Sequence, residues 1–285
     1  MNMFKKFLSI ILVFIVCYEV SFGTDTFEAK EKKLKYDKNS ALALNYHRIR
    51  DDNYLDQFLS IFSNSKELSS YSITSKEFEE QIKWLKNHNA HFLTEKELLK
   101  YKEKGEFPPR SVWVNFDDMD NSIYRNAHPI LKKYNVPATG FVITGEVGSK
   151  DFHNLNMATE EELIKMKKSG LWSFSSHTND LHTLNSDGNS KMINSSNKAL
   201  TADIKKSNDY LKTKLGTDNQ TLAYPYGQMR DSKIKGLKKA NIKYGYALEE
   251  RAITPDDNNY YLPRILVSKD AFNQLVKKWE GFNND

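Results

Sequence analysis

Two adjacent acids, Asp117 and Asp118, directly follow the apolar and β-branched run Ser111–Phe116. Such a run predicts an interior strand of an α/β protein, and acids at its carboxyl end lie in the crevice where this class places its chemistry. Neighbouring residues of an extended chain point to opposite sides, so we expect one acid to bind a metal and the other to act as a base. By itself the motif is equally compatible with a strand followed by an Asp-rich turn.

A second expected strand, residues 173–176, ends at His177, and His182 follows in the next loop. Two imidazoles and one carboxylate, with positions left for water, form a catalytic arrangement for Zn²⁺ or a similar divalent ion. A lone His at a strand end is more often a structural residue with its hydrogen bonds satisfied. The prediction of a metal site therefore depends on finding both histidines together with the Asp117–Asp118 pair.

Two further apolar strands end in residues suited to a site. Residues 221–224 run into Pro225-Tyr226-Gly227, a rigid turn that can aim a backbone N–H at a ligand, and residues 41–46 end at His47. Four strands with site-type residues at their carboxyl ends favour one shared centre.

In this order, the Asn-Phe-Asp-Asp run, the spaced His pair, the Pro-Tyr-Gly turn and the early Tyr-His resemble the polysaccharide deacetylases of carbohydrate esterase family four. The motifs span residues 47–227, and Pro-Arg-Ile at 263–265 extends the likeness. Within the family the likeness is greatest to members that act on poly-β-1,6-N-acetyl-D-glucosamine. The resemblance implies a single distorted (β/α) barrel of about seven strands.

The resemblance also implies roles. Asp118, His177 and His182 would hold one divalent ion, with zinc expected and cobalt or nickel able to substitute. Asp117 would be the base, because an unliganded carboxylate beside the ion can take a proton from water. Tyr226 would offer its backbone N–H to the oxyanion that forms at the substrate carbonyl.

Two departures from the family pattern concern the acid and the partner of the base. Most relatives take the acid from a His on a late strand, but none of the seven histidines lies beyond His182. Only His47 ends a buried-looking strand, so the motif order looks circularly permuted and His47 is the expected acid; the alternative is an ordinary loop-edge His. Many relatives have an Arg where Ala223 stands. Arg264 is the expected replacement, and the alternative is a surface ion pair.

The elements that must position these residues alternate as strand and helix seven or eight times, without a linker or repeat, which predicts one α/β barrel-like domain. Further strands are expected at 244–248 and 261–267, helices at 199–215 and 271–279, and a mobile surface loop at 185–197. Three capping boxes predict helix starts: Thr74 with Glu77, Thr94 with Glu97, and Thr159 with Glu162.

The N-terminus is basic and then apolar, which predicts a signal peptide over about residues 1–28 and a deacetylase domain over 29–285. Cleavage after Glu28 would remove the only cysteine, Cys17, and leave a net charge of +6 from 40 basic and 34 acidic residues, where the whole chain carries +5. A modest positive charge predicts loose electrostatic association with anionic cell-surface polymers. Nucleic-acid binding is not expected, because the lysines are scattered and no stacking aromatics accompany them. We expect a monomer.

These observations predict a secreted, metal-dependent N-deacetylase of extracellular poly-N-acetylglucosamine, with loops at 48–72 and 185–197 flanking an open groove. Rival activities are deacetylation of peptidoglycan or chitin oligomers, or O-deacetylation of another glycan. A carbohydrate-binding module on a catalytically dead scaffold is the non-enzymatic alternative. The Asp pair, the His pair and His47 speak against that alternative, because binding alone needs neither base nor acid.

Overall fold

The computed structural model describes residues 34–51 and 71–282. The predicted signal peptide and most of the predicted loop at 48–72 therefore lie outside the described residues. Within the described ranges, no helix is both long and apolar enough to cross a membrane.

Seven parallel strands form the sheet that carries the site, in the order β10-β1-β5-β6-β7-β8-β9. Both β1 and β5 are buried along their whole length, which is why they read as continuous apolar runs rather than as alternating ones. The short strand β4 (His91–Phe92) also pairs with the start of β5. The strand bounds are β1 Ala41–Tyr46, β5 Ser111–Phe116, β6 Ala138–Val142, β7 Trp172–Ser176, β8 Thr221–Ala223, β9 Tyr244–Tyr246 and β10 Ile265–Leu266.

The last strand segment joins the two ends of this sheet. On the β9 side, Leu262 N–H donates to the Gly245 carbonyl at 3.0 Å, and Ala247 N–H donates to the Leu262 carbonyl at 2.9 Å. On the β1 side, Val267 N–H donates to the Asn45 carbonyl at 2.9 Å. The parallel sheet therefore curls round on itself, as the predicted distorted barrel requires.

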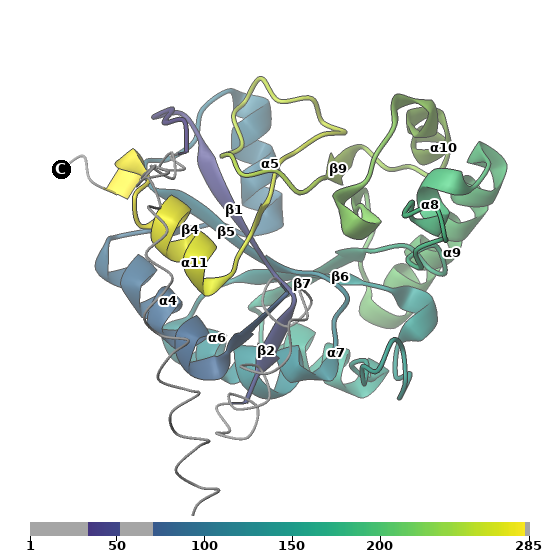
Figure 1. The fold of residues 1–285 in the computed structure, drawn as a ribbon, viewed down its shortest axis with the longest axis horizontal. Coiled ribbons are helices and arrows are strands. Elements are labelled where there is room, and N and C mark those ends of the chain that lie inside the picture. The colour runs from purple at the N-terminus through teal and green to yellow at the C-terminus, as the bar shows by residue number, and fades with distance from the viewer. Residues whose placement is uncertain (1–33, 52–70, 283–285) are drawn as a thin grey trace, which may run out of the picture. The chain divides into compact units, whose positions relative to one another are not determined.

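Helices surround the curled sheet (Figure 1). Three of them begin at the predicted capping boxes, in which the Thr hydroxyl accepts from the third backbone N–H and the Glu side chain returns to the cap. A π-helical turn, η1 (Ile123–Ala127), leads into α6. The helix bounds are α4 Ser75–Asn87, α5 Glu95–Lys104, α6 His128–Tyr134, α7 Glu160–Lys168, α9 Asn197–Leu215, α10 Ile234–Lys239 and α11 Lys269–Ala271. A smaller parallel pair, β2 (Arg48–Arg50) and β3 (Ser72–Thr74), lies outside the main sheet.

Several predicted elements are shorter than expected. The strands predicted at 244–248 and 261–267 are β9 and the two-residue β10, because Pro263 has no N–H to extend a regular ladder. The helix predicted at 271–279 is α11 followed by a π-helical turn at Phe272–Val276.

The prediction of a loop at 185–197 is wrong for the helical residues within that range, which are 191–194 and residue 197, the first of α9. Residues Lys191–Asn194 form the short helix α8, capped by Ser190. The Gln228 side chain then holds the preceding turn, since its Oε1 accepts from Ser190 N–H at 2.7 Å and its Nε2 donates to the Gly188 carbonyl at 3.0 Å.

Alternation along the central strands separates two sets of side chains. Leu42, Leu44 and their neighbours pack outward against the helices, while Ala43 and Trp113 belong to a separate core cluster with Tyr246. Since every second residue of a strand faces the same side, Asn115 and Asp117 continue the row that Trp113 begins. The strand that fills the core thus also presents the polar residues of the site.

Candidate active site

The two aspartates diverge because the backbone turns between them. Asp117 continues the inward row of β5, whereas Asp118 and Met119 adopt positive φ values of 65° and 63°. Left-handed backbone is uncommon for residues other than glycine and tends to cluster at functional sites. The turn directs the Asp118 carboxylate toward the end of β7, where the two histidines lie.

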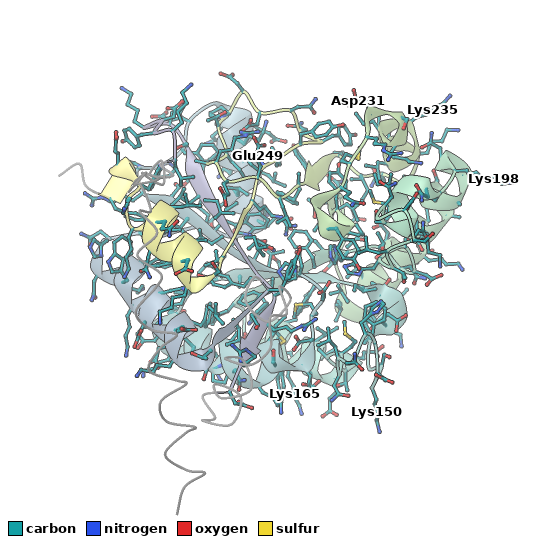
Figure 2. The ribbon with its side chains drawn as sticks, viewed as in Figure 1. Lys150, Lys165, Lys198, Asp231, Lys235 and Glu249 are labelled. Carbon is teal, nitrogen blue, oxygen red and sulfur yellow. The ribbon has the colours of Figure 1, made fainter. Side chains whose placement is uncertain are left out.

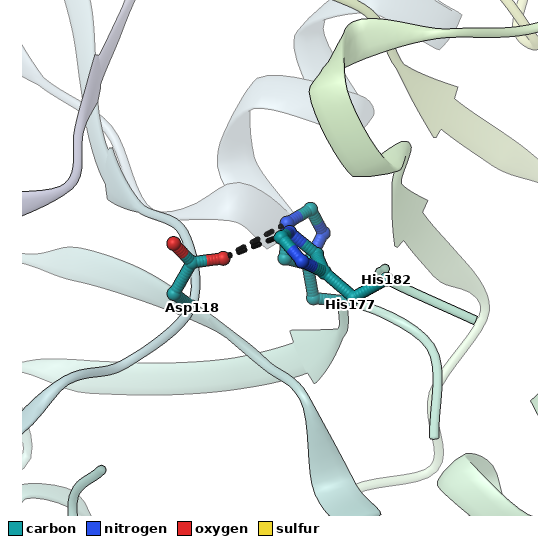
Figure 3. Close-up of side chains that lie close together, drawn as sticks. All are labelled: Asp118, His177 and His182. Atoms are coloured by element: carbon teal, nitrogen blue, oxygen red, sulfur yellow. Dashed lines mark ion pairs between the residues drawn. The ribbon is translucent and has the colours of Figure 1, made fainter. Parts of the chain in front are cut away.

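Asp118, His177 and His182 form one tight cluster (Figure 3). Asp118 Oδ1 lies 3.1 Å from His182 Nε2 and 3.4 Å from His177 Nε2. One ligand-type atom from each of the three residues falls within 4.8 Å of the others. Thr178, with a φ of 74°, turns the chain directly after His177 and lets the loop return His182 to the cluster.

The cluster has the chemistry of a cation site. The Ala223 carbonyl, 2.8 Å from His177 Nδ1, can only accept a hydrogen bond, so it holds a proton on Nδ1 and leaves Nε2 of the neutral ring as a lone pair facing Asp118. Asp118 Oδ1 is buried and has no hydrogen-bond donor among the described residues. Burial lowers the pKa of His177, but Asp117 and Asp118 outweigh it and raise that pKa. Each observation indicates that a positive charge would be stabilised between these side chains. Their nitrogen and oxygen donor atoms suit Zn²⁺ or a similar divalent ion.

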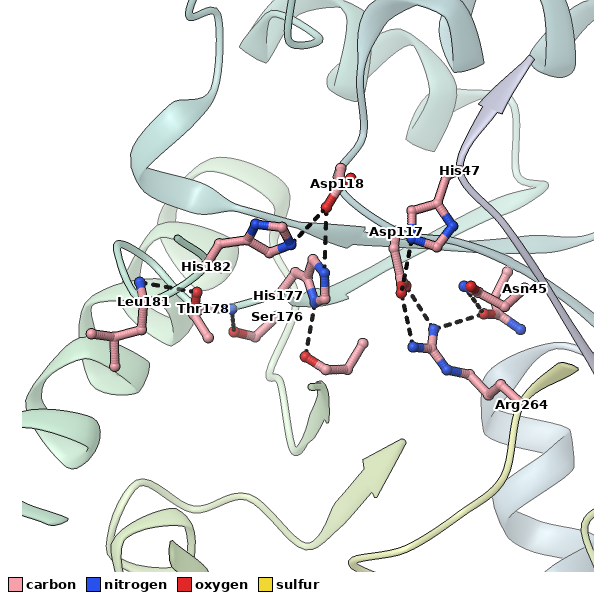
Figure 4. A network of polar contacts seen from close by, with 12 residues as sticks. Asn45, His47, Asp117, Asp118, Ser176, His177, Thr178, Leu181, His182 and Arg264 are labelled. Atoms are coloured by element: carbon pink, nitrogen blue, oxygen red, sulfur yellow. Dashed lines mark hydrogen bonds and ion pairs between the residues drawn. The ribbon is translucent and has the colours of Figure 1, made fainter. Parts of the chain in front are cut away.

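Asp117 is held by Arg264 through two hydrogen bonds (Figure 4). The guanidinium Nη1 and Nη2 donate to Oδ1 at 2.6 Å and Oδ2 at 2.8 Å. The side chains are 0% and 2% exposed, so the alternative of a surface ion pair for Arg264 is wrong. Burial acts to raise the pKa of Asp117, but the guanidinium outweighs it and holds that pKa below its usual value. Asp117 is therefore a charged carboxylate at neutral pH.

Other buried groups fix the guanidinium in turn. Arg264 Nη1 also donates to Asn115 Oδ1 at 2.9 Å, and Asn45 Nδ2 donates to the same oxygen at 3.0 Å. The guanidinium carbon lies 5.1 Å from the ring centroid of Phe141 and 5.9 Å from that of Tyr246, within the range of cation–π attraction. Side chains from β1, β5, β6 and β9 thus hold Arg264, which directly precedes β10, and Arg264 positions the base.

His47 lies on the other side of Asp117. Its Nε2 is 3.9 Å from Asp117 Oδ2, and its ring meets that of Tyr71 edge-on with centroids 4.9 Å apart. Burial lowers the pKa of His47, partly opposed by the Asp117 and Asp118 carboxylates. The strand order brings it here, because β1 lies directly beside β5 with Tyr46 opposite Phe116.

Tyr226 and the other site residues line one cavity of about 450 Å³. The Tyr226 backbone has a φ of 57°, and its ring centroid lies 4.9 Å from that of His182. Gly227 is needed beside it, because a Cβ there would lie 2.8 Å from Leu248 Cβ. The structure thus brings six predicted site residues to the cavity wall, with Arg264 directly behind Asp117. The wall residues are His47, Asp117, Asp118, His177, His182 and Tyr226.

Some residues at the site were not predicted. Asn45 and Asn115 are opposite each other on β1 and β5, and both are fully buried. A polar residue inside an otherwise apolar buried strand was the available signal for them. The turn Phe152–Leu155, which forms part of the cavity wall, carried no comparable signal.

Comparison with known proteins gives a consistent result. A model of the polysaccharide deacetylase family matches residues 104–245. The chain is 52% identical to a poly-β-1,6-N-acetyl-D-glucosamine N-deacetylase of Staphylococcus aureus (strain MSSA476), over 98% of each chain. It is 53% identical to the protein of that name from Staphylococcus epidermidis, over 98% of this chain and 97% of the relative.

Among solved structures, IcaB from Ammonifex degensii matches with a TM-score of 0.74 and 28% sequence identity, covering 87% of this chain and 99% of that one. The match extends the likeness from the sequence to the fold. The chain belongs to the polysaccharide deacetylase family and is a hydrolase that acts on amide C–N bonds.

Proposed function

We propose that this protein is a secreted, metal-dependent enzyme that removes acetyl groups from poly-β-1,6-N-acetyl-D-glucosamine. The observation that carries the chemistry is the charged Asp117 carboxylate, fixed by Arg264, beside the cluster of Asp118, His177 and His182. A binding module would need no buried carboxylate held ionised next to a cation site.

Asp118, His177 and His182 would hold the divalent ion. When bound, such an ion polarises a carbonyl and makes water more acidic. Asp117 is not part of the cluster, and both of its oxygens accept from Arg264. Its carboxylate can therefore act as general base and take the proton of the water that attacks the acetyl carbonyl.

The amine must leave with a proton, and His47 is placed to supply it. His47 lines the cavity, and its Nε2 lies 3.9 Å from Asp117 Oδ2. As the C–N bond breaks, the protonated form of His47 donates a proton to the amine nitrogen, and the products are acetate and a free amino sugar. The proton that Asp117 takes from water can then restore the protonated His47. Tyr226, which lines the same cavity next to His182, would direct its backbone N–H to the oxyanion.

The support for the substrate is the high identity to relatives named for this activity, together with a cavity that opens at the carboxyl ends of the strands. The test compares free-amine release from purified β-1,6 polymer, chitin oligomers and peptidoglycan at equal metal loading, with Asp117→Asn as the blank. The fastest release is expected from the β-1,6 polymer. Faster release from chitin or peptidoglycan would contradict the substrate and leave the deacetylase chemistry standing.

Export rests on the basic and apolar N-terminus alone. We expect the mature protein outside the cell or at its surface, with a new N-terminus near residue 28. Cell fractionation and N-terminal sequencing test this directly: full-length protein in the cytoplasm would contradict it.

A further inference from the structure

The positive charge of the chain is concentrated in one part of the fold. Residues 191–243 contain twelve Lys and Arg and four Asp and Glu, a formal charge of +8, whereas the whole chain carries only +5. These residues include α9 and α10, which pack against each other. The lysines look scattered along the sequence, but eight of these twelve basic residues lie on α9 and α10.

Four of these lysines line one groove. Lys198 and Lys205 project from α9, and Lys235 and Lys239 project from α10, around a groove of about 500 Å³. Lys198 and Lys235 are seen at the outer edge of the molecule beside these helices (Figure 2). Among residues 34–51 and 71–282, none of the four ammonium groups lies within ion-pair distance of a carboxylate. The other lining residues are Asn197, Thr201 and Ala202, none of them acidic.

The groove is rigidly built, because α9 and α10 are joined along their length. The Thr201 hydroxyl lies 2.9 Å from the Gly236 carbonyl, and Asn208 Nδ2 donates to the Ala240 carbonyl at 2.9 Å. Gly236 allows the close approach, since a Cβ there would lie 2.8 Å from Asn197 Oδ1. The four ammonium groups are thus carried by a preformed frame, which reduces the entropy lost on binding a ligand.

We propose that this groove, lined by Lys198, Lys205, Lys235 and Lys239, binds a flexible polyanionic chain with repeating phosphate groups. Four like charges on two facing walls repel one another, and an anionic chain lying between them relieves that repulsion. A concave site admits a polymer chain but not a flat bilayer. It also lacks aromatic side chains, which single-stranded nucleic acids use for stacking. The catalytic cavity shares no lining residue with this groove, so binding here would localise the enzyme without blocking its site.

The test measures binding of inorganic polyphosphate by the full chain as salt concentration is varied. In the groove variant, all four lysines are changed to Gln. In the control variant, the same charge is removed elsewhere, at the exposed residues Lys96, Lys100, Lys104 and Lys132. We expect the groove variant to bind on the order of a thousandfold more weakly near 0.1 M salt. The slope of log K against log salt should fall by about 3, as expected for the loss of four phosphate contacts to a single chain.

The control variant should change affinity no more than about threefold, through net charge alone. Both variants should keep the melting temperature and the turnover of a short soluble oligomer, because all eight side chains are exposed and outside the cavity. The pair Lys235→Gln and Lys239→Gln gives an intermediate slope and guards against misfolding of the fourfold variant. Equal losses in the groove and control variants would overturn the proposal, as would a wild type that ignores polyphosphate. Tighter binding to anionic lipid vesicles or to oligo(dT) than to polyphosphate would also overturn it.

Discussion

Replacing Arg264 by Met tests whether this side chain positions the base. The substitution keeps a long side chain but removes both hydrogen bonds to Asp117, which is 2% exposed. Removing one partner of a buried ion pair leaves the other charge uncompensated and lowers the free energy of unfolding by roughly 3–5 kcal/mol. At about 2–4 °C per kcal/mol for a domain of this size class, the melting temperature should fall by roughly 6–20 °C. Turnover should fall on the order of a hundredfold, the typical contribution of a general base.

The pH dependence separates a positioning role from a structural one. In the wild type, Arg264 holds the pKa of Asp117 below its usual value, so the base remains charged well into the acid range. Without the guanidinium, burial dominates and raises the pKa of Asp117. The acid limb of the kcat/KM profile should therefore move to higher pH in Arg264→Met, measured by amine release at constant metal occupancy.

The double variant Arg264→Met, Asp117→Asn provides the stability control. It removes both charges, so it should recover much of the lost melting temperature while turnover stays low. Arg264→Lys, which keeps the charge but not the paired hydrogen bonds, should fall between wild type and Arg264→Met. An Arg264→Met variant that melts early but keeps the wild-type turnover and pH profile would refute the positioning role.

Three further predictions concern the metal, the acid and a surface ion pair. Elemental analysis should find no bound divalent ion in His177→Ala or His182→Ala, and a chelator should abolish wild-type activity. Full metal occupancy in both variants would contradict the assignment of these histidines as metal ligands. His47→Ala should keep the ion but lose turnover on the order of a hundredfold, and near-normal turnover would exclude it as the acid. Lys133 lowers the pKa of Glu79 to about 2, so this pair stabilises the fold above about pH 4.5 and ceases to do so as pH falls toward 2. The melting temperature of Glu79→Gln should be roughly 1–3 °C below that of the wild type at pH 7 and equal to it near pH 2. The same difference in melting temperature at both pH values would contradict the contribution of this ion pair.

Much of this architecture could be read from local patterns. The three Thr–Glu capping boxes gave helix starts because the cap depends only on residues three apart. Strands β1 and β5 were predicted because parallel strands buried on both faces must be apolar throughout. The residues of the cavity wall followed, since the carboxyl ends of such strands meet at one edge.

The features that escaped prediction depend on long-range contacts. The resemblance led us to expect Arg264 beside Asp117, but no local pattern encodes its burial, which arises because the last strand segment inserts between β9 and β1. The left-handed backbone at Asp118 and Thr178 is imposed by the site rather than by residue preference. Helix α8 was missed because its surroundings are rich in Ser, Asn and Gly, and its turn depends on distant Gln228.

The position of Arg264 also has a consequence for how the chain matures. The segment that carries it is synthesised after strands β1 to β9, yet it supplies the counter-charge for Asp117 and the hydrogen bonds that join β9 to β1. Until that segment has been synthesised, the nascent polypeptide would have to bury an uncompensated carboxylate in order to close its sheet. We therefore expect docking of this segment to close the sheet and to pair the catalytic base in the same step. A prematurely terminated chain ending before residue 264 should be a target for proteolysis rather than a weakly active enzyme.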